Sequence, residues 1–140
     1  MNTAVSSSPF KKNHMEIHWH EYAKENRSGS IIHGDLLAKA SIIGRVGIMM
    51  LSCGTGAWRV RSSMNELSEL MGVTCTVDSG LMSINYTCFD GDNSFSQSLC
   101  LTNTGVNTSQ LNRLEKFVSD FQEKYLPESC DKIHTALDEI

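Results

Sequence analysis

The sequence predicts an α+β fold: a helical hairpin, a three-stranded antiparallel sheet, and then a long and a short C-terminal helix. Apolar residues recur every three or four positions over residues 31–53 and 57–71, a pattern typical of two amphipathic helices. The period changes to two between residues 74 and 102, which indicates strands. The helical period returns after residue 107. A chain of 140 residues is long enough to bury one core.

The first two helices are expected to meet at a glycine-rich corner. The first helix, over about residues 31–53, carries an apolar stripe formed by Leu36, Ala40, Ile43, Gly47 and Met50. Glycine destabilises a helix interior, so a close backbone approach and a tight turn are needed to offset the glycines of this region, which are Gly44, Gly47, Gly54 and Gly56. The second helix, over about residues 57–71, should end at Gly72, where a glycine C-cap is common.

Three strands should follow the hairpin. Residues 74–78 alternate and are rich in β-branched side chains, which favours a first strand. Ser79-Gly80 predicts a turn, residues 81–89 a second strand, and the loop at residues 90–93 a hairpin. The third strand is expected over residues 95–102, with apolar side chains at alternate positions.

Two helices are expected at the C-terminal end. Asn107 can cap the long helix, with Gln110 as the partner of a capping box, and Pro127 should stop it. Ser129 can cap the short helix, which extends to Ile140. We expect its apolar positions to be exposed and to mediate dimers, because exposed stripes tend to find partners; these positions are Ile133, Leu137 and Ile140.

Composition narrows the class of protein. A formal net charge of −4 argues against a nucleic-acid partner, which would favour a basic face. The longest apolar run, residues 46–51, is far shorter than a membrane span, and no secretion signal is evident. Five cysteines with irregular spacing predict reduced thiols in a cytoplasmic setting. We expect residues 1–30 to be a flexible segment, Ser-rich at its start, and residues 31–140 to form the domain.

The glycine corner also carries a family resemblance. A Gly-Arg pair before an apolar run, then Leu-x-x-Gly-x-x-aromatic-Arg-Val and a second amphipathic helix, resembles the soluble amino-terminal domain of the threonine/serine exporter family of bacterial membrane proteins. The matching residues are Gly44, Arg45, Leu51, Gly54, Trp58, Arg59 and Val60. The resemblance continues through Leu67, Leu70, Gly72 and the step Gly105-Val106-Asn107, and covers about residues 31–140. Thr55-Gly56 stand where the family often has Ala-Glu, so no role that needs an acidic residue there carries over.

The resemblance implies a function. Members of the family move small amino acids or small organic acids outward through a membrane portion that follows this domain. This chain would then gate export, sense substrate or organise assembly at the cytoplasmic face of the bacterial inner membrane. Its partners would be the membrane portion or a companion membrane subunit, a small amino or organic acid, and further copies of itself. The alternatives are a free-standing regulatory domain that binds a small carboxylate and, third, a weak hydrolase.

Arg59 is the first candidate for a binding residue. It lies at a glycine-rich helix start, where free backbone N–H groups and a guanidinium could converge on a carboxylate. Gly54, Ser63 and Asp78 complete this candidate substrate site. The structural alternative is that Arg59 pairs with Asp78 or Glu66 and only fixes the corner.

Other patterns are weaker. His14, His18 and Glu21 would share a face if helical and could hold a metal, but a closed site needs a fourth ligand and a rigid frame, so a polar lead-in with Ile17 and Trp19 on the domain is favoured. Cys53 lacks a histidine fixed beside it, and no P-loop or dinucleotide motif is present. We therefore expect no cofactor, no bound metal and no enzymatic activity.

Overall fold

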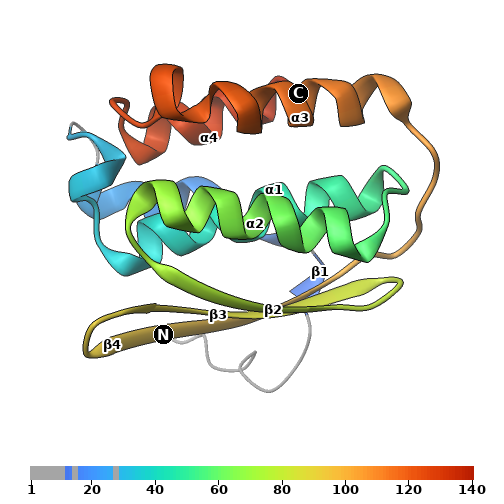
Figure 1. The fold of residues 1–140 in the computed structure, drawn as a ribbon, viewed down its shortest axis with the longest axis horizontal. Coiled ribbons are helices and arrows are strands. Elements are labelled where there is room, and N and C mark those ends of the chain that lie inside the picture. The colour runs from blue at the N-terminus through green and yellow to red at the C-terminus, as the bar shows by residue number, and fades with distance from the viewer. Residues whose placement is uncertain (1–11, 14–15, 27–28) are drawn as a thin grey trace.

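The computed structural model describes residues 12–13, 16–26 and 29–140 and arranges them in three layers (Figure 1). The sheet forms one outer layer. Helices α1 (Leu36–Ser52) and α2 (Ala57–Met71) form the middle layer. Helices α3 (Thr108–Asp120) and α4 (Cys130–Asp138) form the other outer layer. The predicted α+β class, with a helical hairpin, a three-stranded antiparallel sheet and two C-terminal helices, is confirmed.

Helix α1 lies between the sheet and the outer helices, so most of its side chains are buried. This explains why its apolar residues spread beyond a single stripe. Its glycines serve close approach, as predicted: Gly44 faces Tyr86 of the sheet, and Gly47 faces Met64 of α2. The predicted start at residue 31 is wrong. A short 3-10 turn, η4 (Ile31–His33), comes first, and Asp35 then caps α1 by accepting a hydrogen bond from the Ala38 N–H at 2.9 Å.

The corner between α1 and α2 is the tight turn that the glycines predict. Gly54 has φ +89°, a conformation that a side chain would strain. The Cys53 carbonyl accepts a hydrogen bond from the Asn107 N–H at 3.2 Å, which ties the corner to the loop before α3. The predicted bounds of α2 are confirmed, and Gly72 ends it in the left-handed conformation at φ +79°.

The sheet has the strand order β1-β4-β3-β2. Strands β2 (Thr74–Ser79), β3 (Ser83–Asp90) and β4 (Asn93–Cys100) are antiparallel, and each lies within three residues of its predicted bounds. Strand β1 (Lys12–Asn13) pairs in parallel with β4 and was not predicted, because two residues give no readable period. Alternate side chains face α1 and α2; those most deeply buried are Ile84, Tyr86, Cys88 and Leu99.

The five cysteines are free, as their count and spacing predict. Cys75 and Cys88 lie directly opposite each other on β2 and β3. A hydrogen bond between the two thiols lowers the pKa of Cys75, and the same bond, followed by burial, raises the pKa of Cys88. Burial also raises the pKa of Cys53 and brings that of Cys130 to about 12.

These shifts predict an order of thiol reactivity, because the thiolate is the nucleophile. A limiting amount of iodoacetamide at neutral pH should alkylate Cys75 before Cys53, Cys88 and Cys130. Peptide mass spectrometry at several reaction times measures the order. Modification of Cys130 ahead of Cys75 would contradict the assignment.

The long C-terminal helix begins at the predicted cap, where the Asn107 side chain accepts a hydrogen bond from the Gln110 N–H. Its end is a π-helical turn, η5 (Phe121–Tyr125). Ser129 caps α4, as predicted. The expected exposure of the α4 stripe is wrong for Ile133 and Leu137, which are buried because α4 packs on α1 and on η3 (Trp19–Asn26). This removes the basis for a dimer through α4, and self-association stays a prediction.

The 3-10 helix η3 brings the N-terminal segment onto the domain. Trp19 and Ala23 are buried against it, and Ile17 is half-buried, in line with the predicted contacts of Ile17 and Trp19. The Ser-rich start, residues 1–11, lies outside the described residues. The division of the chain at residue 30 stays a prediction.

Candidate functional site

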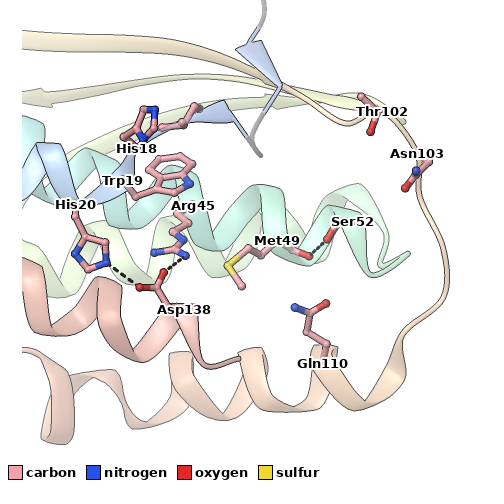
Figure 2. A pocket seen from close by; sticks show the side chains of 11 residues that line it. His18, Trp19, His20, Arg45, Met49, Ser52, Thr102, Asn103, Gln110 and Asp138 are labelled. Atoms are coloured by element: carbon pink, nitrogen blue, oxygen red, sulfur yellow. Dashed lines mark hydrogen bonds and ion pairs between the residues drawn. The ribbon is translucent and has the colours of Figure 1, made fainter.

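An open cleft of about 760 Å³ lies between the N-terminal segment, the C-terminal half of α1, the loop after β4 and the two outer helices (Figure 2). One end is charged and is formed by His20, Arg45 and Asp138. The middle is apolar, with Ile17, Trp19 and Met49. The far end is polar and uncharged, with the side chains of Ser52, Thr102, Asn103 and Gln110.

The charged end joins three elements that are distant in the sequence. Asp138 of α4 accepts a hydrogen bond from Arg45 Nη2 of α1 at 2.5 Å, and its second oxygen lies 2.8 Å from His20 Nε2 of η3. His20 Nδ1 lies 2.7 Å from Asp131 Oδ1. Hydrogen bonds to Asp131 and Asp138 raise the pKa of His20 against the opposing effect of burial. The net pKa of Asp138 is lowered: burial acts against this, but hydrogen bonds from Arg45 and His20 prevail.

A buried histidine, His134 of α4, contacts the charged end through Arg45. His134 is fully buried; its Nε2 lies 2.9 Å from Ser41 Oγ and its Nδ1 3.1 Å from Arg45 Nη1. Arginine can only donate, so Nδ1 must be the acceptor and Nε2 must carry the proton. Burial, followed by the charge of Arg45, lowers the pKa of His134 to about 3. His134 is therefore neutral near pH 7, with a tautomer fixed by Arg45.

This tautomer defines what Ser41 can do. The Ser41 hydroxyl donates to the Ala38 carbonyl at 2.7 Å and accepts from His134 Nε2. A serine nucleophile needs the opposite arrangement, in which the imidazole nitrogen accepts the hydroxyl proton. The pair is also fully buried. Ser41 and His134 thus position Arg45 and are not arranged as a nucleophile and its base.

Trp19 forms the apolar wall beside the charged end. Its ring stacks on the His134 ring at a centroid distance of 6.1 Å, and the Arg45 guanidinium carbon lies 5.9 Å from the Trp19 ring centroid. Only 7% of the Trp19 side chain is exposed. An aromatic face over a guanidinium is a favourable cation–π contact. Trp19 therefore joins the hydrophobic core to the charged end of the cleft.

The polar end is held by α1 and α3. The Ser52 hydroxyl donates to the Met49 carbonyl at 2.6 Å, and the Cys53 thiol donates to Gln110 Oε1 at 3.2 Å. The Gln110 amide group and the Asn103 side chain face the cleft from opposite sides (Figure 2). Cys53 is thus hydrogen-bonded to an amide oxygen, and burial raises the pKa of its thiol. This geometry gives no support to a cysteine nucleophile.

The residues of the predicted corner site are not brought together around one ligand position. Arg59 forms an ion pair with Glu115 of α3, and its guanidinium lies 5.9 Å from the Trp58 ring centroid. The predicted structural alternative named Asp78 or Glu66, so the kind of contact is as expected and the partner is different. Asp78 lies on the sheet face that points away from the helices, while Gly54 contacts the loop at Gly105 and Val106. Ser63 follows Arg59 by one turn of α2. Binding by these residues stays a prediction.

The exposed ion pair of Arg59 with Glu115 is expected to contribute little to the stability of the fold. The Arg59 side chain is 44% exposed and that of Glu115 is 36% exposed, and exposed pairs stabilise a fold by about 0.2–1 kcal/mol. Arg59→Ala and Glu115→Ala should each lower the free energy of unfolding by less than about 1 kcal/mol, with the double variant no worse than the sum. Urea unfolding measures this. A loss of several kcal/mol in Arg59→Ala alone would contradict the prediction.

The candidate metal ligands can be placed only in part. His14 lies outside the described residues. His18 lines the cleft and Glu21 is exposed on η3. Within residues 12–13, 16–26 and 29–140, no three His, Cys, Asp or Glu side chains are grouped so as to hold a metal. The neighbouring His20, which was not among the predicted ligands, has each ring nitrogen within hydrogen-bond distance of a carboxylate.

Sequence reasoning also missed Arg45, His134 and Asp138 as site residues. One signal was available: Arg45 is a single charge inside the apolar run of α1, and a charge there must find a partner. His134 and Asp138 are four residues apart on α4 and so share a face. The sequence does not say that this face meets Arg45.

By its fold and its cleft, the protein is a three-layer α+β domain with a cleft of small-molecule size that is charged at one end. The model of the family described as "Putative threonine/serine exporter" (ThrE) matches residues 41–140. The chain therefore belongs to the threonine/serine exporter family, as the sequence resemblance indicated. No curated protein and no solved structure matches it. Among the described helices, none is long and apolar enough to cross a membrane.

Proposed function

We propose that this chain is the cytoplasmic sensing domain of a threonine/serine exporter-type transporter, and that a small amino or organic acid binds in its cleft to gate export. The family supports a transporter context with a small-molecule substrate. In this proposal the domain works at the cytoplasmic face of the bacterial inner membrane, with the membrane portion or a companion membrane subunit, and as a homo-oligomer. In this proposal the domain acts by binding its ligand; it catalyses no reaction and needs neither a cofactor nor a nucleic acid.

The observation that carries the proposal is the pairing of both charge signs at one end of the cleft. Asp138 is 46% exposed and offers a carboxylate to an ammonium group, and the positive charges of His20 and Arg45 beside it would attract a ligand carboxylate. The polar end, formed by Ser52, Thr102, Asn103 and Gln110, adds amide and hydroxyl groups. The cleft volume of about 760 Å³ lies in the range of small-molecule sites. A short zwitterion with a hydroxyl group matches this distribution of polar groups.

Calorimetric titration with threonine, serine and succinate tests the binding. Asn103→Ala should weaken binding about threefold to tenfold, because one hydrogen bond contributes about 0.5–1.5 kcal/mol. Asn85→Ala, on the outer face of the sheet, is the matched control and should bind like the parent. Absence of binding of all three compounds to the folded parent, or equal losses in both variants, would overturn the cleft as the site.

Gating needs a transport readout. Cells that produce the membrane portion with this chain should export threonine faster than cells with the membrane portion and the Asn103→Ala chain. Binding in solution without any difference in export would instead support the free-standing regulatory domain.

A further inference from the structure

Both ring nitrogens of His20 contact carboxylates of α4. Nδ1 lies 2.7 Å from Asp131 Oδ1, and Nε2 lies 2.8 Å from Asp138 Oδ2. A carboxylate can only accept, and a neutral imidazole carries a single N–H. The two contacts are both hydrogen bonds only when the ring is an imidazolium. Loss of one proton leaves a lone pair against a carboxylate oxygen.

The charged groups around His20 come from three elements. Asp131 and Asp138 face it from α4, and the ring of His134, also on α4, lies 5.7 Å from it by centroids. Arg45 of α1 reaches it through the shared carboxylate of Asp138. On its own element, Glu21 is exposed next to it. Asp138 is also paired with Arg45, whereas among the described residues Asp131 forms an ion pair with His20 alone. The position of the Asp131 carboxylate therefore depends more on the proton of His20.

His20 joins the N-terminal segment to α4 at the edge of the cleft. Its two contacts are the only ion pairs between η3 and α4 among the described residues. Asp131 and Asp138 lie almost two helical turns apart, near opposite ends of α4, and their carboxylates converge on the one ring. The cleft wall formed by Ile17, His18 and Trp19 comes from the same segment. The contacts of His20 with Asp131 and Asp138 therefore also help to fix the position of this wall.

We propose that His20 is a proton-operated clasp on the cleft: the imidazolium ties the segment 16–26 to Asp131 and Asp138, and loss of its proton loosens the segment and opens that wall. As a regulator of ligand binding, the clasp rests on the proposed function. As a local opening of the N-terminal segment, it stands on the geometry alone.

The direction of the pH effect follows from linkage. The hydrogen bond to Asp131, and then those to Asp138, raise the pKa of His20 above its ordinary 6.5, while burial opposes this. The clasp is fully closed below the ordinary pKa and is lost as the pH rises through the raised value. The wall formed by the N-terminal segment should thus be held in place near pH 6 and be loose on the alkaline side.

Trp19 reports the clasp, because it is 7% exposed and adjoins His20 in the chain. The other tryptophan, Trp58, is 66% exposed, and Trp58→Phe removes its background emission. In this variant, acrylamide quenching of Trp19 should increase and its emission should shift to longer wavelength from about pH 6 to about pH 8.5, through the histidine range. Far-UV circular dichroism should stay unchanged across the range.

Two variants and a control assign the effect. His20→Gln, added to Trp58→Phe, should show the alkaline level of quenching at every pH. Asp131→Asn should move the transition to lower pH, which a purely structural contact would not do. His18→Gln, on the same segment and also lining the cleft, should titrate like the parent. A pH-independent Trp19 in the parent, or an unchanged transition in His20→Gln, would overturn the clasp.

Threonine titrations at both ends of this pH range separate the two proposals. Tighter binding at the acidic end in the parent, and no pH dependence in His20→Gln, would support both. A Trp19 transition without binding at either pH would retain the clasp and overturn the cleft as a sensor. Binding with a pH-independent Trp19 would retain the sensor and overturn the clasp.

Discussion

Gly44→Ala is expected to lower the free energy of unfolding by about 2–3 kcal/mol, because overpacking a rigid core position costs about this much. A Cβ on Gly44 would lie 2.5 Å from Tyr86 Cζ and still closer to the hydroxyl. Tyr86 cannot move aside easily, because it is buried and its hydroxyl donates to the Ala40 carbonyl at 2.9 Å and lies 2.8 Å from Gln97 Oε1. The clash outweighs the gain of up to about 1 kcal/mol in helix propensity.

Gly47→Ala is the matched control for this clash. A Cβ there would lie 2.9 Å from Met64 Cγ and also close to the sulfur, but the methionine side chain is flexible and can repack. We expect a much smaller effect than in Gly44→Ala. Urea unfolding of both variants gives the comparison. Equal stability of the two variants would show that the Gly44–Tyr86 approach does not limit the packing of α1 on the sheet.

His134 should make the domain sensitive to acid. Its pKa is held near 3 in the folded protein, against an ordinary value of 6.5, by burial and then by Arg45. Since the depressed pKa favours the neutral ring in the folded state, stability from this group is complete above pH 6.5 and is lost as the pH falls toward 3. The free energy of unfolding should drop by about 1.4 kcal/mol per pH unit, or about 2–3 kcal/mol from pH 6.5 to about 4.5.

Urea unfolding at several pH values measures this slope. His134→Gln should be less stable than the parent at pH 7 but should show a shallower slope between about pH 6.5 and about 4.5, where carboxylates of ordinary pKa remain charged. If this variant fails to fold, proton NMR of the parent provides the test, because the His134 ring signals should not titrate above about pH 4.5. A His134 ring that titrates near pH 6.5 would contradict the prediction.

The two histidines act in separate pH windows. The pKa of His20 is raised, so the protonated ring stabilises the contact of η3 with α4 until the pH rises above the ordinary histidine pKa. His134, with its lowered pKa, destabilises the fold below 6.5. Together they predict maximal stability near the ordinary histidine pKa of 6.5. The local opening at Trp19 should therefore be seen on the alkaline side, and the loss of global stability on the acidic side.

Much of the fold could be predicted because its determinants are local. The bounds of α2 follow from the corner glycines and the αL position of Gly72. Asn107 and Ser129 mark the starts of α3 and α4 with side-chain caps. Each of these signals depends on residues within one turn of each other. The start of α1 was missed because the apolar residues Ile31 and Ile32 extend the helical pattern into η4, ahead of the Asp35 cap.

The placement of the site depended on the tertiary structure. His20, Arg45 and Asp138 come from η3, α1 and α4, and their contacts depend on how three helices are rotated about their axes and where they cross. The same applies to Arg59, whose partner proved to be Glu115 of α3. It also applies to Ile133 and Leu137, buried by a segment more than a hundred residues earlier.

The sequence by itself determined the family, the order of the elements and most of their ends, because periodicity, glycines and caps act over a few neighbouring residues. Only the tertiary structure decided which charges meet, which face of α4 is covered, and that His134 is neutral while His20 is held between two carboxylates. The physical reason is that desolvation and ion pairing depend on distances between segments remote in sequence, and no local pattern encodes those distances.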